Sequence, residues 1–271
     1  MNFMKIFISD LHLGDGSKSD DFNRDQEFLE FLDFVEAKAT ELIIVGDFLE
    51  LWQADLDKIL LKHEKVITRL LGLREKIKLT YVIGNHDYVP FIKFTDLGLG
   101  ICLQYNDPQS GIIAEHGFQY DIFNSYQDPN ESLKQPIGKY FAQSIGVLEK
   151  LIHPNVDQWA KKALEGIDTF FQSAVSVKNK VSPQSQEYFD KGGHFGEFGE
   201  AVKAHINRGT KVVIFGHIHR PELSQKGQGI YANCGTWVDG SKPTYIACHK
   251  DRIELNYALS HKNLKILSRD T

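Results

Sequence analysis

Regular structure begins with the stretch Lys5-Ile6-Phe7-Ile8-Ser9-Asp10-Leu11-His12. The apolar run at residues 6–8 is typical of a buried strand, and the polar residues Asp10 and His12 follow directly where that strand ends. Apolar residues then recur at helical spacing over residues 28–35, and a second apolar run follows at residues 42–45. This strand, helix and strand together predict two parallel strands joined by a helix.

The same alternation continues along the first half of the chain. Residues 59–71 have the apolar spacing of a second helix, and residues 79–83 form a third apolar run. Further strands are predicted at 112–114 and 212–215. We therefore expect a largely parallel sheet with helices on both faces. Near the carboxyl end, short apolar runs without helices between them predict a closing antiparallel sheet at 230–233, 245–248 and 253–259.

The middle of the chain differs from both ends. Residues 132–181 show two amphipathic helical patterns broken at Pro154, and the glycine-rich stretch 192–196 comes after them. We interpret 132–199 as a helical insertion within a single domain that spans residues 1–271. Its apolar stripe permits two functions: it packs on the core, or part of it stays open as a cap over a substrate.

Composition limits the classes of function. The net charge is −5 and no basic block is present, so we expect no specific binding of nucleic acid. No apolar run approaches the roughly 20 residues that a membrane-spanning helix needs. The amino terminus lacks the pattern of a secretory signal, and the 3 cysteines are widely spaced. These features predict a cytoplasmic protein and leave its oligomeric state open.

Metal-binding side chains follow five of the predicted strands. Because ligands bind at the carboxyl ends of strands in α/β sheets, we expect these side chains to meet at one site. Seven nitrogen and oxygen donors without a thiol exceed what one tetrahedral zinc ion uses, whereas two ions that share a carboxylate use them well. The donors are Asp10, His12, Asp47, Asn85, His116, His217 and His219.

Two of the motifs are specific for this composition. A shuffled chain would contain roughly 0.04 copies of Gly-His-x-His and roughly 0.003 copies of Gly-Asn-His-Asp. This chain has the first at residues 216–219 and the second at residues 84–87. With Asp-x-His, Gly-Asp and a further His, they resemble the calcineurin-like metallophosphoesterases at every motif from Asp10 to His219. The resemblance implies an α/β fold, with a two-sheet β core flanked by helices.

A closer resemblance concerns three segments. Residues 46–52, 216–221 and 233–237 are similar to the bacterial UDP-2,3-diacylglucosamine diphosphatase group, which also carries a helical insertion between its last two metal-binding segments. Two positions depart from that group, which usually has Arg where this chain has His86 and Asp where it has Phe118.

The superfamily resemblance also implies roles for the site residues. Asp10, His12 and His219 would bind one divalent ion, and Asn85, His116 and His217 would bind the other, with Asp47 as the bridge. A hydroxide bound by both ions would attack phosphorus, His86 would stabilise charge or protonate the leaving oxygen, and Asp87 would orient the His86 ring. Arg220 is expected either to contact a substrate phosphate or to pair with a surface carboxylate. Manganese is the preferred metal, with iron and zinc as alternatives.

These motifs predict an enzyme that hydrolyses a phosphodiester or pyrophosphate bond. The closer resemblance implies a nucleotide-sugar lipid such as UDP-diacylglucosamine, which would bring the protein to the inner face of the membrane. Two alternatives stay open: a phosphodiesterase or phosphatase for a soluble nucleotide or phosphomonoester, and a scaffold that keeps the fold without catalysis.

Overall fold

The computed structural model describes residues 4–17, 20–51, 53–87, 100–121, 195–238 and 240–269. The chain divides into two compact units, residues 1–117 with 202–271, and residues 118–201. Of the second unit, only helix α5 (Phe118–Asp121) and the first part of α9 (Phe195–Asn207) are described. The predicted helical insertion lies almost wholly outside the described residues, so it stays a prediction. All residues predicted to bind metal belong to the first unit.

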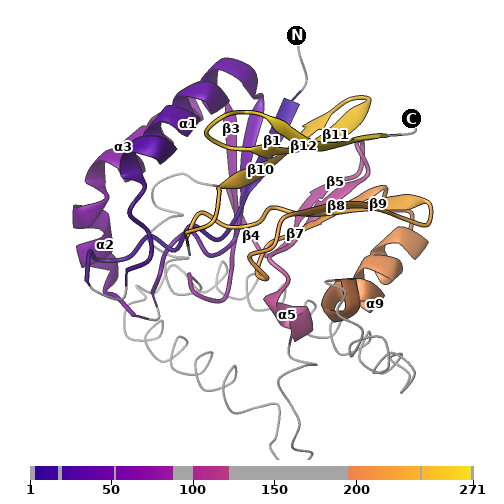
Figure 1. Ribbon diagram of the computed structural model, residues 1–271, viewed down its shortest axis with the longest axis horizontal. Helices are drawn as coiled ribbons and strands as arrows, with labels where there is room; N and C mark the ends of the chain where they lie inside the picture. The colour runs from indigo at the N-terminus through magenta and orange to yellow at the C-terminus, as the bar shows by residue number, and fades with distance from the viewer. Residues whose placement is uncertain are drawn as a thin grey trace, which may run out of the picture. The chain divides into compact units, whose positions relative to one another are not determined.

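A mixed sheet of seven strands contains both ends of the first unit (Figure 1). Its order is β12-β11-β10-β1-β2-β3-β4. The strands β1 to β4 are parallel, with bounds Met4–Ile8, Glu41–Val45, Lys78–Val82 and Gly100–Cys102. An antiparallel extension adds β10 (Thr244–His249), β11 (Arg252–Tyr257) and β12 (Asn263–Ser268).

A second sheet has the order β5-β6-β7-β9-β8. Its central strands β6 (Ile112–Ala114), β7 (Val212–Phe215) and β9 (Gly229–Asn233) are parallel. The edge strands β5 (Tyr105–Asp107) and β8 (Glu222–Lys226) pair with them in the antiparallel sense. The prediction that residues 230–233 belong to the closing antiparallel sheet was therefore wrong, because β9 joins the second sheet beside β7.

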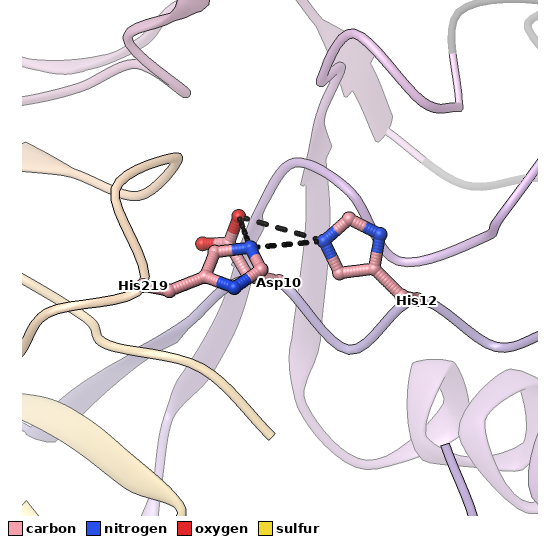
Figure 2. Close-up of side chains that lie close together, drawn as sticks. All are labelled: Asp10, His12 and His219. Carbon is pink, nitrogen blue, oxygen red and sulfur yellow. Dashed lines mark hydrogen bonds and ion pairs between the residues drawn. The ribbon is translucent and has the colours of Figure 1, made fainter. Parts of the chain in front are cut away.

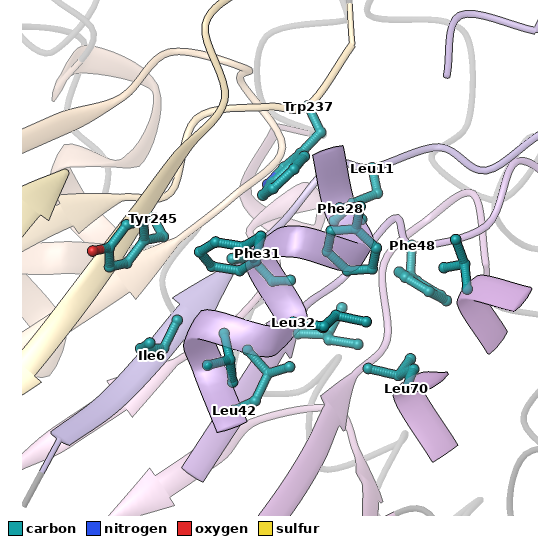
Figure 3. Packing of buried hydrophobic residues seen from close by; sticks show 14 of the residues in the cluster. Ile6, Leu11, Phe28, Phe31, Leu32, Leu42, Phe48, Leu70, Trp237 and Tyr245 are labelled. Carbon is teal, nitrogen blue, oxygen red and sulfur yellow. The ribbon is translucent and has the colours of Figure 1, made fainter. Parts of the chain in front are cut away.

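Helices cover one face of the first sheet. They are α1 (Asp25–Lys38), α2 (Leu56–Lys62) and α3 (Glu64–Gly72), and the short 3-10 helix η1 (Leu73–Glu75) follows α3. The side chains of Phe28, Phe31 and Leu32 on α1 are buried against the sheet together with Trp237 (Figure 3). Apolar spacing on α1 thus buries one helix face, as the sequence predicts.

The other face of the first sheet packs against the second sheet. Ile6 and Ile8 of β1 lie in the core beneath the helices, whereas Phe7 lies in a second core with Ile112 and Val212. Because successive strand residues point to opposite faces, a fully buried strand must have two covering layers. The expectation of helices on both faces was wrong, and the two-sheet α/β core flanked by helices is confirmed.

No described helix is long and apolar enough to cross a bilayer.

Phe28 offers a test of the core under the helices. Its ring is 0% exposed and lies 5.0 Å from the ring of Trp237 between centroids. We expect Phe28→Ala to lower the free energy of unfolding by about 3–5 kcal/mol, because the substitution removes buried apolar surface and leaves a cavity. Urea denaturation measures this loss. Leu61→Ala on α2 is the control, since Leu61 is 78% exposed, and a loss in Phe28→Ala as small as in this control would contradict the packing.

Candidate metal centre

The candidate ligands lie in loops that follow the carboxyl ends of parallel strands. Asp10 and His12 follow β1, Asp47 follows β2, and Asn85 follows β3. In the second sheet, His116 follows β6, while His217 and His219 follow β7. Backbone hydrogen bonds join the first two loops, from Asp10 N to Gly46 O at 3.1 Å and from His12 N to Asp47 O at 2.9 Å.

Five of these residues have a left-handed backbone. The φ angles are 55° at Asp10, 51° at His12, 49° at Asp47, 71° at His217 and 55° at His219. Such angles are uncommon for residues with a side chain, and each costs conformational energy that the surrounding structure must offset. Their concentration in the described site indicates that the fold forces these loops to turn sharply so that the side chains converge.

Glycines next to the ligands leave room for this convergence. A Cβ at Gly84 would collide with the carboxylate and the backbone nitrogen of Asp47, and one at Gly216 would lie 2.7 Å from Asp10 Oδ2. At Gly46, where φ is 82°, a Cβ would collide with the ring of His116. The glycines of the Gly-Asp, Gly-Asn-His-Asp and Gly-His-x-His motifs are therefore required by close approach.

Asp10, His12 and His219 form the first group of donors (Figure 2). Nε2 of His219 lies 3.4 Å from Oδ1 of Asp10 and 3.1 Å from Nε2 of His12. Nε2 of His12 lies 3.9 Å from the same Asp10 oxygen. Three donor atoms from two strand ends thus face one another.

Asp47, His116 and His217 form a second group. Oδ2 of Asp47 lies 3.0 Å from Nε2 of His116, and Oδ1 of Asn85 lies 3.1 Å from the same nitrogen. The rings of His116 and His217 meet edge to face with centroids 5.2 Å apart. Asn85 therefore lies beside this group.

The two groups adjoin each other. Oδ2 of Asp47 is 3.9 Å from Nε2 of His12, a member of the first group. Oδ1 of Asp10 is likewise 4.0 Å from Nε2 of His116 in the second group. The structure thus brings all seven residues proposed as ligands into one contiguous cluster of nitrogen and oxygen atoms.

Buried charge dominates the electrostatics of this cluster. Asp10 is 0% and Asp47 1% exposed, and burying two carboxylates requires compensating positive charge. Burial opposes ionisation and is the largest single effect, yet the charge of His116 together with the contacts of the neighbouring histidines keeps the pKa of both Asp10 and Asp47 below the usual value. Conversely, burial disfavours the charged His116 ring, but Asp47 and Asp10 raise its pKa to about 10. The site therefore favours bound cations.

The surroundings also orient the rings for metal binding. His116 Nδ1 donates a hydrogen bond to Val45 O at 2.9 Å, which leaves Nε2 directed toward Asp47. His12 Nδ1 contacts Glu50 Oε2 at 2.9 Å while its Nε2 faces Asp10 and His219. Hydrogen bonds of this kind select the tautomer of metal-binding histidines. The donor set of imidazole, carboxylate and amide oxygens therefore fits divalent metal ions.

Glu50 is a site residue that the sequence analysis did not identify. Its Oε2 lies 2.7 Å from His86 Nδ1 and 2.9 Å from His12 Nδ1, so one carboxylate contacts two site histidines. Burial would raise the pKa of Glu50, but the hydrogen bonds with His12 and His86 lower it to about 2. The signals in the sequence were its position three residues after Asp47 and its place within the segment 46–52 that resembles the diphosphatase group.

Asp87 has contacts that differ from the predicted ones. Its carboxylate accepts hydrogen bonds from Phe48 N at 2.6 Å and Gly84 N at 2.7 Å, and it also contacts the Tyr81 hydroxyl. Burial and the charge of Asp47 raise the pKa of Asp87 to about 6. The sequence analysis assigned the orientation of the His86 ring to Asp87, whereas the carboxylate at that ring is Glu50. Arg220 is exposed next to His219.

Comparison with known proteins agrees with this arrangement. The family model of the calcineurin-like phosphoesterases matches residues 5–221. A UDP-2,3-diacylglucosamine hydrolase of Coxiella burnetii is 24% identical over 232 residues, which cover 80% of this chain and 81% of the relative. One of Blochmanniella pennsylvanica is 36% identical over 85 residues, 31% of this chain and 32% of the relative.

Among solved structures, a dimetal phosphatase from Danio rerio superposes with a TM-score of 0.50 at 12% identity. The superposition covers 98% of both chains and concerns the fold alone. Because the family model spans most of the chain, the assignment does not depend on any single relative. The chain is a metal-dependent phosphoester hydrolase and belongs to the calcineurin-like phosphoesterase family.

Proposed function

We propose that this hydrolase works with two divalent metal ions bound side by side. The observation that carries the proposal is the position of Asp47, whose Oδ2 lies 3.0 Å from His116 and 3.9 Å from His12. One carboxylate within reach of both donor groups is suited to bridge two ions. The first ion would be held by Asp10, His12 and His219, and the second by Asn85, His116 and His217.

When bound, such a pair of ions supplies Lewis acidity that neutralises phosphoryl oxygens and lowers the pKa of water. The donors are hard or borderline nitrogen and oxygen atoms, for which manganese is our preferred assignment, with iron and zinc as alternatives.

The residues around the ions would divide the remaining work. Glu50 contacts Nδ1 of His86 and so fixes the orientation of that ring. We assign to His86 Nε2 the proton that the leaving oxygen needs, or the stabilisation of charge that develops on it. The contacts of Asp87 with Phe48 N and Gly84 N support a role in holding the turn that carries His86.

For the substrate we propose a nucleotide-sugar lipid with a phosphodiester or pyrophosphate bond. The support is the relative from Coxiella burnetii, whose name states that it acts on UDP-2,3-diacylglucosamine, together with its 80% coverage of this chain. Arg220 beside His219 would contact a phosphate of such a substrate. Contact with the membrane surface and a cap formed by residues 132–199 belong to the same proposal.

The first test combines metal analysis with a substrate panel. Asp47→Ala should abolish uptake of a second equivalent of Mn²⁺ and lower hydrolysis by more than about 100-fold, since loss of an outer partner alone typically costs 10–100-fold. Asp33→Ala is the control, because the Asp33 side chain is 72% exposed in an ion pair with Arg69. Near-wild-type activity of Asp47→Ala with Mn²⁺ would refute the site. Faster turnover of a soluble nucleotide or phosphomonoester than of the nucleotide-sugar lipid would contradict the proposed substrate.

Metal uptake should also release protons. The pKa of His116 is about 10, so its ring is protonated at neutral pH and must lose that proton before Nε2 binds a cation. Metal affinity should therefore rise as the pH is raised toward 10 and fall as the pH is lowered. Calorimetric titration with Mn²⁺ in two buffers of different ionisation enthalpy measures the protons released. A heat of Mn²⁺ binding that is the same in both buffers would contradict the predicted protonation of His116.

Glu50→Gln tests the residue that the sequence analysis missed. The amide lacks the negative charge and offers one acceptor oxygen where the carboxylate offers two, so we expect metal affinity and kcat to fall by about 10–100-fold while KM changes little. Steady-state kinetics and Mn²⁺ titration measure the two effects. Glu36→Gln is the matched control, because Glu36 pairs with Arg69 and Lys76 outside the site. Equal kinetics of the two variants would exclude a role for Glu50.

A further inference from the structure

Residues 233–237, called the support loop below, begin at the last residue of β9 and contact two of the metal-binding loops without belonging to either. Asn233 Nδ2 donates to Gly216 O at 2.7 Å, and Asn233 Oδ1 accepts from Gly235 N at 3.0 Å. Ser9 Oγ donates to Gly235 O at 3.2 Å. Asn233 and Ser9 are both 0% exposed, so these bonds are shielded from water.

The second set of contacts reaches Asp10. Thr236 Oγ1 donates to the Asp10 carbonyl oxygen at 2.9 Å, and Trp237 N donates to the same oxygen at 3.1 Å. Thr236 is 3% exposed. The main chain of a metal-binding residue is thus held by two donors from the support loop, while its carboxylate remains directed at the histidines.

The peptide between Gly216 and His217 is held at both of its polar groups. Its carbonyl oxygen accepts from Asn233, and its N–H, which belongs to His217, donates to Asp10 Oδ2 at 3.0 Å. Asp10 and His217 both have left-handed backbones, with φ of 55° and 71°. Such angles persist only where surrounding contacts hold them, and the hydrogen bonds from the support loop are among the contacts made to these two residues.

We propose that Asn233 and Thr236 are positioning residues of the metal centre, which act through the main chain of Gly216 and Asp10 rather than by touching an ion. This inference rests on the proposed function, because it assumes that Asp10 and His217 bind metal. Supporting partners that orient ligands typically change metal affinity by 10–100-fold when they are removed.

The test compares two threonines whose hydroxyls each donate to a main-chain carbonyl near one end of β1. Thr236→Val removes the hydroxyl that holds Asp10, and Thr40→Val removes the hydroxyl that donates to Met4 O at 3.0 Å. Met4 begins β1, whereas Asp10 follows its carboxyl end, so the carbonyl bonded by Thr40 belongs to no proposed ligand. Thr236→Ser retains the hydroxyl and serves as the rescue variant.

A second pair of variants tests the contact with Gly216. Asn233→Leu removes three hydrogen bonds of the amide, with Gly216 O, Tyr231 OH and Gly235 N, without changing charge. Asn256→Leu is the control, because it removes a buried amide on β11 whose Oδ1 accepts a hydrogen bond from Asn263. If Asn233→Leu does not fold by circular dichroism, Asn233→Ser is used, since the smaller side chain also lacks the amide.

Full-length metal-free protein is titrated with Mn²⁺, and thermal unfolding is recorded before the metal is added. We expect Thr236→Val and Asn233→Leu to bind Mn²⁺ about 10–100-fold more weakly, while both control variants bind like the wild type despite lower unfolding temperatures. Thr236→Ser should bind within about threefold of the wild type.

The outcomes separate this inference from the proposed function. Equal Mn²⁺ affinities of Thr236→Val and Thr40→Val, with two equivalents bound by the wild type, would overturn the positioning role alone. Failure of the wild type itself to bind two equivalents would overturn both proposals. Weaker binding by Thr236→Ser, equal to that of Thr236→Val, would also contradict the role of the hydroxyl.

Discussion

Two carboxylates buried among imidazole rings set the main constraint on this structure. Asp10 and Asp47 are almost fully shielded from water, and each lies within 4.0 Å of histidines from both donor groups. Burying two carboxylates together is unfavourable unless positive charge balances them. That charge must come from protonated histidines or from bound metal ions. The strand ends of both sheets, the left-handed turns and the glycines beside them all serve this convergence.

Near the amino end of β1, opposite the metal centre, polar contacts hold the two sheets together. Lys5 Nζ donates to Tyr105 OH at 2.7 Å and to Asp107 Oδ2 at 2.6 Å, and it lies 3.2 Å from Glu41 Oε2. These contacts join β1 and β2 of the first sheet to β5 of the second. Polar contacts therefore connect the sheets at both ends of β1, and the apolar core containing Phe7 lies between them.

The sequence was informative where chemistry restricts residue types, and less so where only burial matters. Gly84 to Asp87 and Gly216 to His219 predicted site residues because each position has a separate steric or ligand requirement, which the structure makes visible. Burial alone could not reveal the second sheet, because a strand such as β1 is equally apolar whether helices or strands cover it. Glu50 escaped notice because a single carboxylate after an apolar run has no characteristic pattern, and its partners lie 36 and 38 residues away.

The reaction class can be inferred from this chain more readily than the substrate, because chemistry restricts the residue types of the donor cluster. The described contacts that hold the donor cluster are made between residues of the first unit, and none of them depends on what is attached to the phosphate. In the proposed function, specificity would come from residues that contact the rest of the substrate, for which the exposed Arg220 is the candidate. His86 stands where the diphosphatase group that this chain resembles usually has Arg. Glu50 connects the His86 ring to His12 in a metal-binding loop. If His86 protonates the leaving oxygen as proposed, one carboxylate would connect that proton donor to the metal-binding residue His12.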